Sequence, residues 1–266
     1  MMNIISIASG KGGVGKSVVS ANLAAILASV GYRVCLVDGD FTLGNLDIML
    51  NVKAEKTTFD FFSKEASLAD IMFGLSPNLY FIPSYSGRDI LTLYSYEQKD
   101  AFERELRELK DLDFIIIDAP TGINPITEHF LKISDKNIII TTAEPTSIMD
   151  SYTMIKLALS QKDEILHLIN FSQNAKEISK TLEQILKNNI QKEFSLKFLG
   201  SIREDKSVGN SIKSRELLFD ECGDLLVVYD LRVVASNLLE SFGYKGLKLE
   251  SIKGIKGFFR KLLDRI

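Results

Sequence analysis

The sequence predicts an α/β domain built on a mostly parallel central sheet with helices on both faces. Apolar runs of strand length alternate with segments of helical period along most of the chain, which is typical of strands connected by helices. Residues 34–37 and 114–117 are apolar throughout, as expected for strands buried on both faces. With 266 residues, 45% of them hydrophobic, the chain is long enough for one large domain of this kind.

Strands and helices are expected to alternate in a definite order. Strands are expected at residues 4–8, 33–38, 79–82, 114–118, 137–141, 165–170 and 196–202. Helices are expected between them, most clearly at residues 18–29, 96–109, 147–160, 175–190 and 225–241. Ligands of such sheets bind beyond the carboxyl ends of the strands, so the residues that follow each strand are the candidates for a functional site.

The first expected strand leads into a glycine-rich loop at residues 9–17, Ser-Gly-Lys-Gly-Gly-Val-Gly-Lys-Ser, which opens onto a helix. This is the context of a phosphate-binding loop, whose backbone N–H groups surround phosphate oxygens. Lys16 is expected to reach the β- and γ-phosphates, and the Ser17 hydroxyl to bind Mg²⁺. The alternative is a glycine-rich turn with an incidental Lys-Ser pair. The residues expected to bind the nucleotide here are Gly10, Lys11, Gly12, Gly13, Val14, Gly15, Lys16, Ser17 and Val18.

Lys11 is a second lysine in this loop, where phosphate binding alone requires none. It is either a solvated surface charge or a cation directed at a phosphate of its own subunit or of a second subunit. With this lysine, residues 9–17 resemble the deviant Walker A motif of the MinD/ParA family of ATPases. The resemblance implies that family's P-loop fold and a slow, partner- or membrane-stimulated hydrolysis of ATP. It also implies that Lys11 contacts the partner subunit's nucleotide, so that ATP with Mg²⁺ holds a homodimer together.

Two carboxylates, Asp38 and Asp40, stand at the end of the second expected strand. Beside Mg²⁺ and a γ-phosphate, one could organise metal-bound water while the other positions the attacking water. An acidic loop without such a role is the alternative. The sequence Asp-Gly-Asp resembles the first switch of the MinD/ParA family, which implies that Asp38 lies near Mg²⁺ and that Asp40 is required for hydrolysis.

The apolar strand at residues 114–118 ends in Asp118, a Walker B arrangement in which the carboxylate holds Mg²⁺ through a water. Thr121-Gly122-Ile123 then resembles the family's second switch, which senses the γ-phosphate. A buried strand that ends in Asp is also common for capping reasons alone. The expected metal site is therefore made of Ser17, Asp38 and Asp118.

Two further strand ends are candidates for adenine recognition. The amide of Asn170 offers a donor and an acceptor to a purine edge, and the MinD/ParA family uses an Asn at this place for adenine. Residues 200–205, Gly-Ser-Ile-Arg-Glu-Asp, match the segment that completes the family's adenine pocket, with Arg203 where a Pro is usual. As an isolated residue, Asn170 is more commonly an ordinary loop side chain.

Composition and charge exclude several classes of protein. No stretch approaches the roughly 20 apolar residues of a membrane span, and no secretory signal precedes the first strand. Cys35 and Cys222 form no metal-binding pair and suit a reducing cytoplasm. Residues 245–266 carry seven basic and two acidic residues, so the rest of the chain carries −8 of a total charge of −3. An acidic body does not favour non-specific binding of nucleic acid.

The chain is expected to divide into an ATPase domain at residues 1–242, a linker at 243–250 and an amphipathic helix at 251–266. On a helical wheel, one face of the last segment is apolar and the opposite face is basic. A helix of this kind suits an anionic membrane surface, which would place the protein on the inner face of the cell membrane. A terminal helix docked on the body is the alternative. The membrane-facing residues are expected to be Ile252, Ile255, Phe258, Phe259, Leu262, Leu263 and Ile266.

Residues 143–156 resemble the flagellar-number branch of the family, FlhG, more than the division-site branch, MinD. The branch resemblance implies a role in flagellar number or placement, with the signal-recognition-type GTPase FlhF and flagellar basal-body proteins as partners. Division-site selection is the main alternative. A ParA-type DNA-segregation ATPase and a metabolic P-loop enzyme remain as further classes, distinguishable by a DNA-binding assay and by turnover of a soluble substrate.

Overall fold

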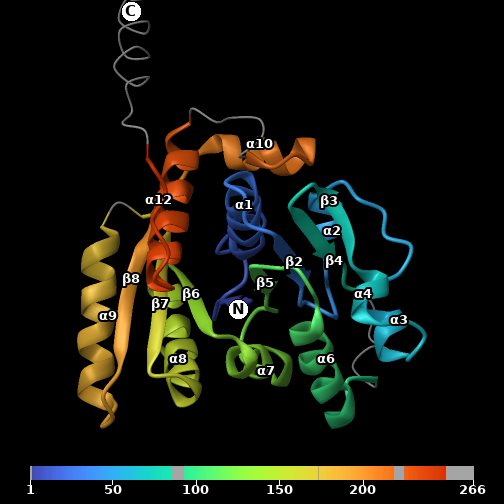
Figure 1. The fold of residues 1–266 in the computed structure, drawn as a ribbon. Coiled ribbons are helices and arrows are strands. Elements are labelled where there is room, and N and C mark those ends of the chain that lie inside the picture. The colour runs from blue at the N-terminus through green and yellow to red at the C-terminus, as the bar shows by residue number, and fades with distance from the viewer. Residues whose placement is uncertain (1, 86–92, 173, 219–224, 250–266) are drawn as a thin grey trace, which may run out of the picture.

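The computed structural model describes residues 2–85, 93–172, 174–218 and 225–249. Within them, an eight-stranded sheet has the strand order β3-β4-β2-β5-β1-β6-β7-β8 (Figure 1). All neighbouring strands are parallel except β3 and β4, which form an antiparallel pair at one edge. The strands are β1 (Asn3–Ala8), β2 (Val34–Asp38), β3 (Phe73–Ser76), β4 (Leu79–Ile82), β5 (Phe114–Asp118), β6 (Lys136–Thr142), β7 (Glu164–Asn170) and β8 (Ser195–Ile202).

Helices cover both faces of this sheet, which confirms the predicted fold class (Figure 1). The longer ones are α1 (Lys16–Ser29), α6 (Tyr96–Glu108), α8 (Pro145–Gln161), α9 (Ala175–Asn189) and α12 (Leu226–Ser241). The shorter ones are α2 (Leu46–Met49), α3 (Thr58–Phe62), α4 (Leu68–Ile71), α7 (Pro125–Ile133) and α10 (Lys206–Ser214). No helix in the described ranges qualifies as a candidate membrane span.

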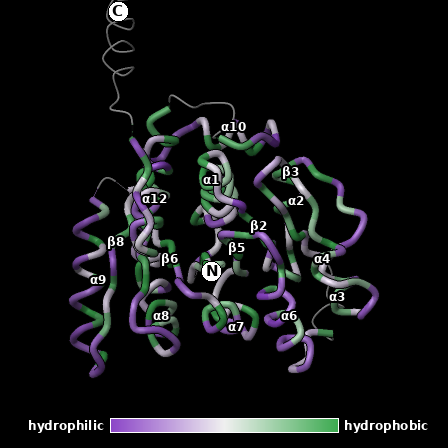
Figure 2. Tube along the Cα trace, viewed as in Figure 1, coloured by the Kyte–Doolittle hydropathy of each residue, from purple (hydrophilic) through white to green (hydrophobic). Residues whose placement is uncertain are grey.

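The sheet separates two hydrophobic cores. In β1, Ile5 and Ile7 pack with α1 and α12, whereas Ile4 and Ala8 pack with α6, α7, α8 and α9 on the other face. This alternation follows from the two-residue period of a strand. Figure 2 shows α1 as largely hydrophobic, as expected for a helix that packs on the sheet and beside α12. Since both faces are covered, ligands reach the sheet only at the ends of its strands.

The expected strands all occur, with bounds that differ by at most two residues, but β3 and the short helices were not predicted. α3 and α4 are four or five residues long, too short to show a helical period. Local caps start them instead: Thr57 and Asp60 bond reciprocally, as do Ser67 and Asp70. α7 begins in the same local way, because the Asn124 side chain accepts from two backbone N–H groups at its start.

The predicted linker is only partly described. Gly243 has φ 80° and ends α12, after which the chain returns along that helix, with the Leu247 N–H bonded to the Ser236 hydroxyl at 3.0 Å. The Tyr244 ring packs against Tyr32 and Phe114. Residues 243–249 therefore lie against the domain. The predicted helix at 251–266, with its membrane-facing residues, lies outside the described residues.

Candidate functional site

Most of the nucleotide-site residues singled out in the sequence gather at the carboxyl ends of β1, β2, β5 and β7. The glycine-rich loop connects β1 to α1, and Gly15 precedes the helix with φ 87°. Gly13 has φ 77°. Both backbones lie in the left-handed region that favours glycine, which explains two of the loop's glycines. The loop ends at the N-terminus of α1, where backbone N–H groups have no helical partner and suit an anion.

Two other elements hold the loop from the sides. An added Cβ on Gly10 would lie 2.4 Å from the Asp150 carbonyl oxygen of α8, so no larger residue fits there without movement. The Gly122 N–H, which precedes α7, donates to the Ser9 carbonyl at 2.9 Å. The predicted second switch at 121–123 thus lies directly against the phosphate loop.

Lys16 forms a buried ion pair with Asp118. Its Nζ lies 2.9 Å from Asp118 Oδ1, and the two side chains are 8% and 3% exposed. The Ser20 hydroxyl lies 3.0 Å from the same oxygen. Sequence reasoning did not identify Ser20, although its four-residue spacing from Lys16 places both on one face of α1. β1, α1 and β5 therefore bring the loop lysine and the Walker B carboxylate into direct contact.

Asp38 is buried beside Asp118, its register partner on the neighbouring strand. Burial and the Asp118 charge raise the pKa of Asp38 to about 7, while N–H groups of Leu46 and Asp40, each at 3.2 Å, oppose the rise. Ser17 stands partly exposed at the start of α1. Oxygen ligands of this kind suit Mg²⁺, which would stabilise two adjacent buried carboxylates. The donor set therefore fits the ion that the sequence implies.

The Asp40 side chain lies within its own loop. Its Oδ1 accepts from the Thr42 hydroxyl at 2.9 Å and from the Leu43 N–H at 3.0 Å. Ser84, at the end of β4, donates to the Asp40 carbonyl at 2.9 Å, and an added Cβ on Gly44 would overlap the Ser84 hydroxyl. Ser84 was not anticipated from the sequence, because no local pattern links it to the loop after β2.

Lys11 pairs within its own chain. Its ammonium contacts the Glu144 carboxylate and lies 3.0 Å from the Thr146 hydroxyl, both at the start of α8. Lys11 and Glu144 remain partly exposed to solvent. The residues are 133 positions apart, so the sequence indicated the lysine but not its partner.

The two candidate adenine residues differ in their surroundings. Asn170 reaches the phosphate loop, where its Nδ2 donates to the Val14 carbonyl at 2.8 Å. The Arg203 guanidinium instead makes two bonds to the Asp230 carboxylate of α12, at 2.6 Å and 2.9 Å. That ion pair raises the pKa of Arg203. Asn170 thus belongs to the assembled site, whereas Arg203 is held toward α12.

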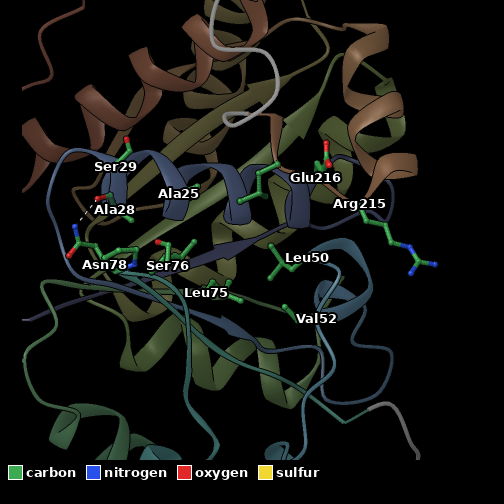
Figure 3. A pocket seen from close by; sticks show the side chains of 13 residues that line it. Ala25, Ala28, Ser29, Leu50, Val52, Leu75, Ser76, Asn78, Arg215 and Glu216 are labelled. Atoms are coloured by element: carbon green, nitrogen blue, oxygen red, sulfur yellow. Dashed lines mark hydrogen bonds between the residues drawn. The ribbon is translucent and has the colours of Figure 1, made fainter.

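A separate pocket of about 770 Å³ lies at the other end of α1. Figure 3 shows Ala25, Ala28 and Ser29 of α1 on one side and Leu75 and Ser76 of β3 on another. Residues 215–217 complete its wall. The phosphate loop precedes the first residue of α1, whereas this pocket is lined by the C-terminal half of α1. The pocket is therefore distinct from the site described above.

Comparison with known proteins places these features in a family. The family model described as "AAA domain" matches residues 2–166. The flagellum site-determining protein YlxH of Helicobacter pylori is 36% identical over 263 residues, covering 97% of this chain and 89% of that protein. The antiactivator FleN of Pseudomonas aeruginosa is 26% identical, covering 82% and 80% of the two chains. The structure of MinD from Pyrococcus horikoshii, complexed with Mg-ADP, has a TM-score of 0.77 at 23% identity and covers 91% and 98%.

Proposed function

This chain belongs to the MinD/ParA family of ATPases, and we propose that it is an ATP-dependent dimerising regulator of flagellar number or placement. The observation that carries the proposal is the 36% identity to a flagellum site-determining protein over 97% of this chain. The antiactivator FleN is a further relative over most of the chain.

ATP with Mg²⁺ is the ligand that this site fits. Mg²⁺ bound to the phosphates would neutralise the charge that develops during γ-phosphoryl transfer. Lys16 supplies a cation at the loop, and the α1 N-terminus supplies backbone donors. Ser17, Asp38 and Asp118 supply the oxygens for the ion. A bound phosphate would attract the Lys16 ammonium away from the Asp118 carboxylate. The carboxylate would then be available to hold Mg²⁺.

Dimerisation through the surface that contains the phosphate loop is supported by exposed side chains around that loop. Lys11 lies on this face and binds only partly exposed groups of its own chain. Three large apolar side chains are more than half exposed beside the site: Leu43 after Asp40, Ile123 in the second switch, and Met149 next to Asp150. Exposed apolar side chains around a polar centre are typical of a protein interface. A second copy, with Lys11 reaching its nucleotide, would cover them.

Membrane association is proposed from the sequence of residues 251–266, which combines an apolar face with basic residues. Two such tails on one dimer would bind an anionic surface far more strongly than one. The protein would then reside in the cytoplasm and on the inner face of the cell membrane, according to its nucleotide. FlhF and basal-body proteins are the proposed partners there.

Division-site selection is the second candidate, favoured by the septum site-determining protein MinD of Bacillus subtilis, which is 32% identical over 78% of this chain. A gene deletion in the organism of origin separates the two. We expect an altered number or position of flagella with normally placed septa, restored by the parent gene but not by the Lys16→Ala variant. Misplaced septa with normal flagella would support the division-site role instead. Purified parent protein should hydrolyse ATP only with Mg²⁺.

A further inference from the structure

We propose that Asn170 is a positioning residue that holds the phosphate loop in its binding shape, whatever base the nucleotide carries. The inference rests on the proposed function, since it concerns how the same site binds a polyphosphate. It differs from the adenine-reading role that the sequence suggested for this residue, because it predicts an effect on ligands that have no base.

The hydrogen bonds of the amide define its orientation. Asn170 Nδ2 donates to the Val14 carbonyl at 2.8 Å, and Oδ1 accepts from the Phe171 N–H at 3.0 Å. In the flipped amide, an oxygen would face the carbonyl and an NH₂ group would face the N–H, so both bonds would be lost. The Asn170 side chain is only 3% exposed. Water cannot readily replace its bond to the loop.

The loop is shaped to receive this amide. An added Cβ on Gly15 would lie 2.4 Å from Asn170 Nδ2 and 3.5 Å from the Phe171 ring. The amide therefore packs directly against Gly15, so that no side chain larger than hydrogen fits there without movement. Val14, whose carbonyl accepts the bond, has its own side chain buried in the core. The packing of the Val14 side chain and the bond from Asn170 to its carbonyl both hold the loop.

The end of β7 is itself held rigidly beneath the loop. Phe171 has φ 55°, an unusual conformation for an aromatic residue, and its N–H is shared between Asn170 Oδ1 and the Ile202 carbonyl at 2.9 Å. β8 therefore anchors the residue that orients Asn170. A strained backbone conformation that is held by hydrogen bonds is typical of residues at functional sites. Preorganisation of this kind lowers the cost of ordering the loop when phosphate binds.

The test uses a ligand without a base. Tripolyphosphate, ATP and GTP, each with Mg²⁺, are titrated calorimetrically into the parent and the Asn170→Leu variant. Leucine keeps the shape of the side chain and adds no charge, but it loses the donor to Val14 and the acceptor for the Phe171 N–H. We expect the affinity for tripolyphosphate to fall about tenfold, the equivalent of one buried hydrogen bond. ATP should lose at least as much, while kcat at saturating ATP changes less than twofold.

Asn137→Leu is the matched control. Asn137 is a buried amide on β6 that donates to the Leu131 carbonyl at 2.9 Å, the same kind of bond away from the loop. It should lower the thermal stability without changing tripolyphosphate affinity. Unchanged tripolyphosphate affinity in Asn170→Leu, with a loss confined to ATP, would overturn the proposal in favour of base reading. Equal losses in both variants would also overturn it. A parent that binds none of the three ligands would instead overturn the proposed function.

Discussion

The Lys16 ammonium and the Asp118 carboxylate form a 2.9 Å ion pair in which both side chains are buried. Lys16 begins α1 and Asp118 ends β5, so the pair joins the phosphate loop to the strand that carries the expected metal ligand. Asp38 is buried alongside. The lysine therefore offsets the negative charge of two adjacent buried carboxylates.

Lys16→Ala should destabilise the ligand-free protein as well as abolish nucleotide binding. Removing one partner of a buried ion pair costs about 3 kcal/mol or more, because the other charge stays buried without compensation. Urea unfolding of the ligand-free chain measures this. Adding Asp118→Asn to Lys16→Ala should restore most of the stability but no ATP affinity. A Lys16→Ala variant as stable as the parent would show that the pair contributes nothing to folding.

Lys11→Ala should remain monomeric in ATP, and Glu144→Gln should dimerise at a lower protein concentration than the parent. Glu144→Gln keeps the shape of the side chain but removes the ion pair with Lys11. Because the pair is partly exposed, its removal should favour dimerisation by at most about 1 kcal/mol per subunit. Light scattering over a range of concentrations measures both. Glu183→Gln, which breaks the exposed pair with Lys187 on α9, is the control. Weaker dimerisation of Glu144→Gln would mean that Glu144 acts in the dimer.

Asp40→Ala should bind ATP and dimerise like the parent but hydrolyse ATP on the order of 100-fold more slowly, as expected when water activation is lost. In the parent, Asp40 Oδ1 accepts from the Thr42 hydroxyl and the Leu43 N–H, which hold the carboxylate in its loop. Thr42→Val removes only the first bond and should change turnover by less than threefold. Single-turnover phosphate release gives these rates. Loss of ATP affinity with normal turnover of bound ATP would contradict the assignment.

The parent should sediment with anionic liposomes more strongly in ATP than in ADP. Salt should weaken this binding, since the charge attraction is screened within roughly 8 Å at physiological ionic strength. Phe258→Glu and a chain ending at Lys248 should not sediment. Tyr96→Glu, which adds the same charge at an exposed aromatic residue of the body, should behave like the parent. Binding that is indifferent to lipid charge, or equal for all variants, would leave residues 251–266 without a membrane role.

His167 should make the fold sensitive to mild acid. Its ring is fully buried between the Thr141 and Ser179 hydroxyls, and burial lowers its pKa to about 3. The unfolded chain takes up this proton near pH 6.5 while the folded chain does not, so stability falls as the pH drops below about 6.5. As the pH falls from 6.5 to 5, His167 should lower the free energy of unfolding by up to about 2 kcal/mol. The free energies of unfolding of the parent and of His167→Gln, measured with urea, should converge as the pH is lowered. A constant difference between the two across this pH range would contradict the prediction.

The phosphate loop, the strands and the Walker B carboxylate could be predicted from the sequence because each is a contiguous pattern. Buried strands appear as apolar runs, and the glycines of the loop precede an apolar segment of helix length. α3 and α4 are too short for periodicity, so their only signals are the caps at Thr57 and Ser67. The roles of the individual site residues stay predictions.

The contacts made by those residues could not be predicted, because tertiary packing chooses the partners. Lys11 meets Glu144 from α8, and Asn170 meets Val14 from across the sheet, 156 positions away. Arg203 was expected near adenine, but its bond to Asp230 depends on how α12 packs beside β8. A polar side chain on a strand end can meet several such partners, and only the assembled fold selects among them.

The position of β1 in the sheet has a consequence for the synthesis of the protein. β1 lies between β5 and β6, and its Ser6 hydroxyl bonds to Asn137, 131 residues later. The strand that carries the phosphate loop therefore leaves the ribosome first but has no neighbour to pair with until β5 and β6 follow. The bond from Asn170 to Val14 closes later still. A nascent chain should gain affinity for Mg-ATP only once residue 170 has emerged, so incomplete chains would not compete for nucleotide or join a dimer.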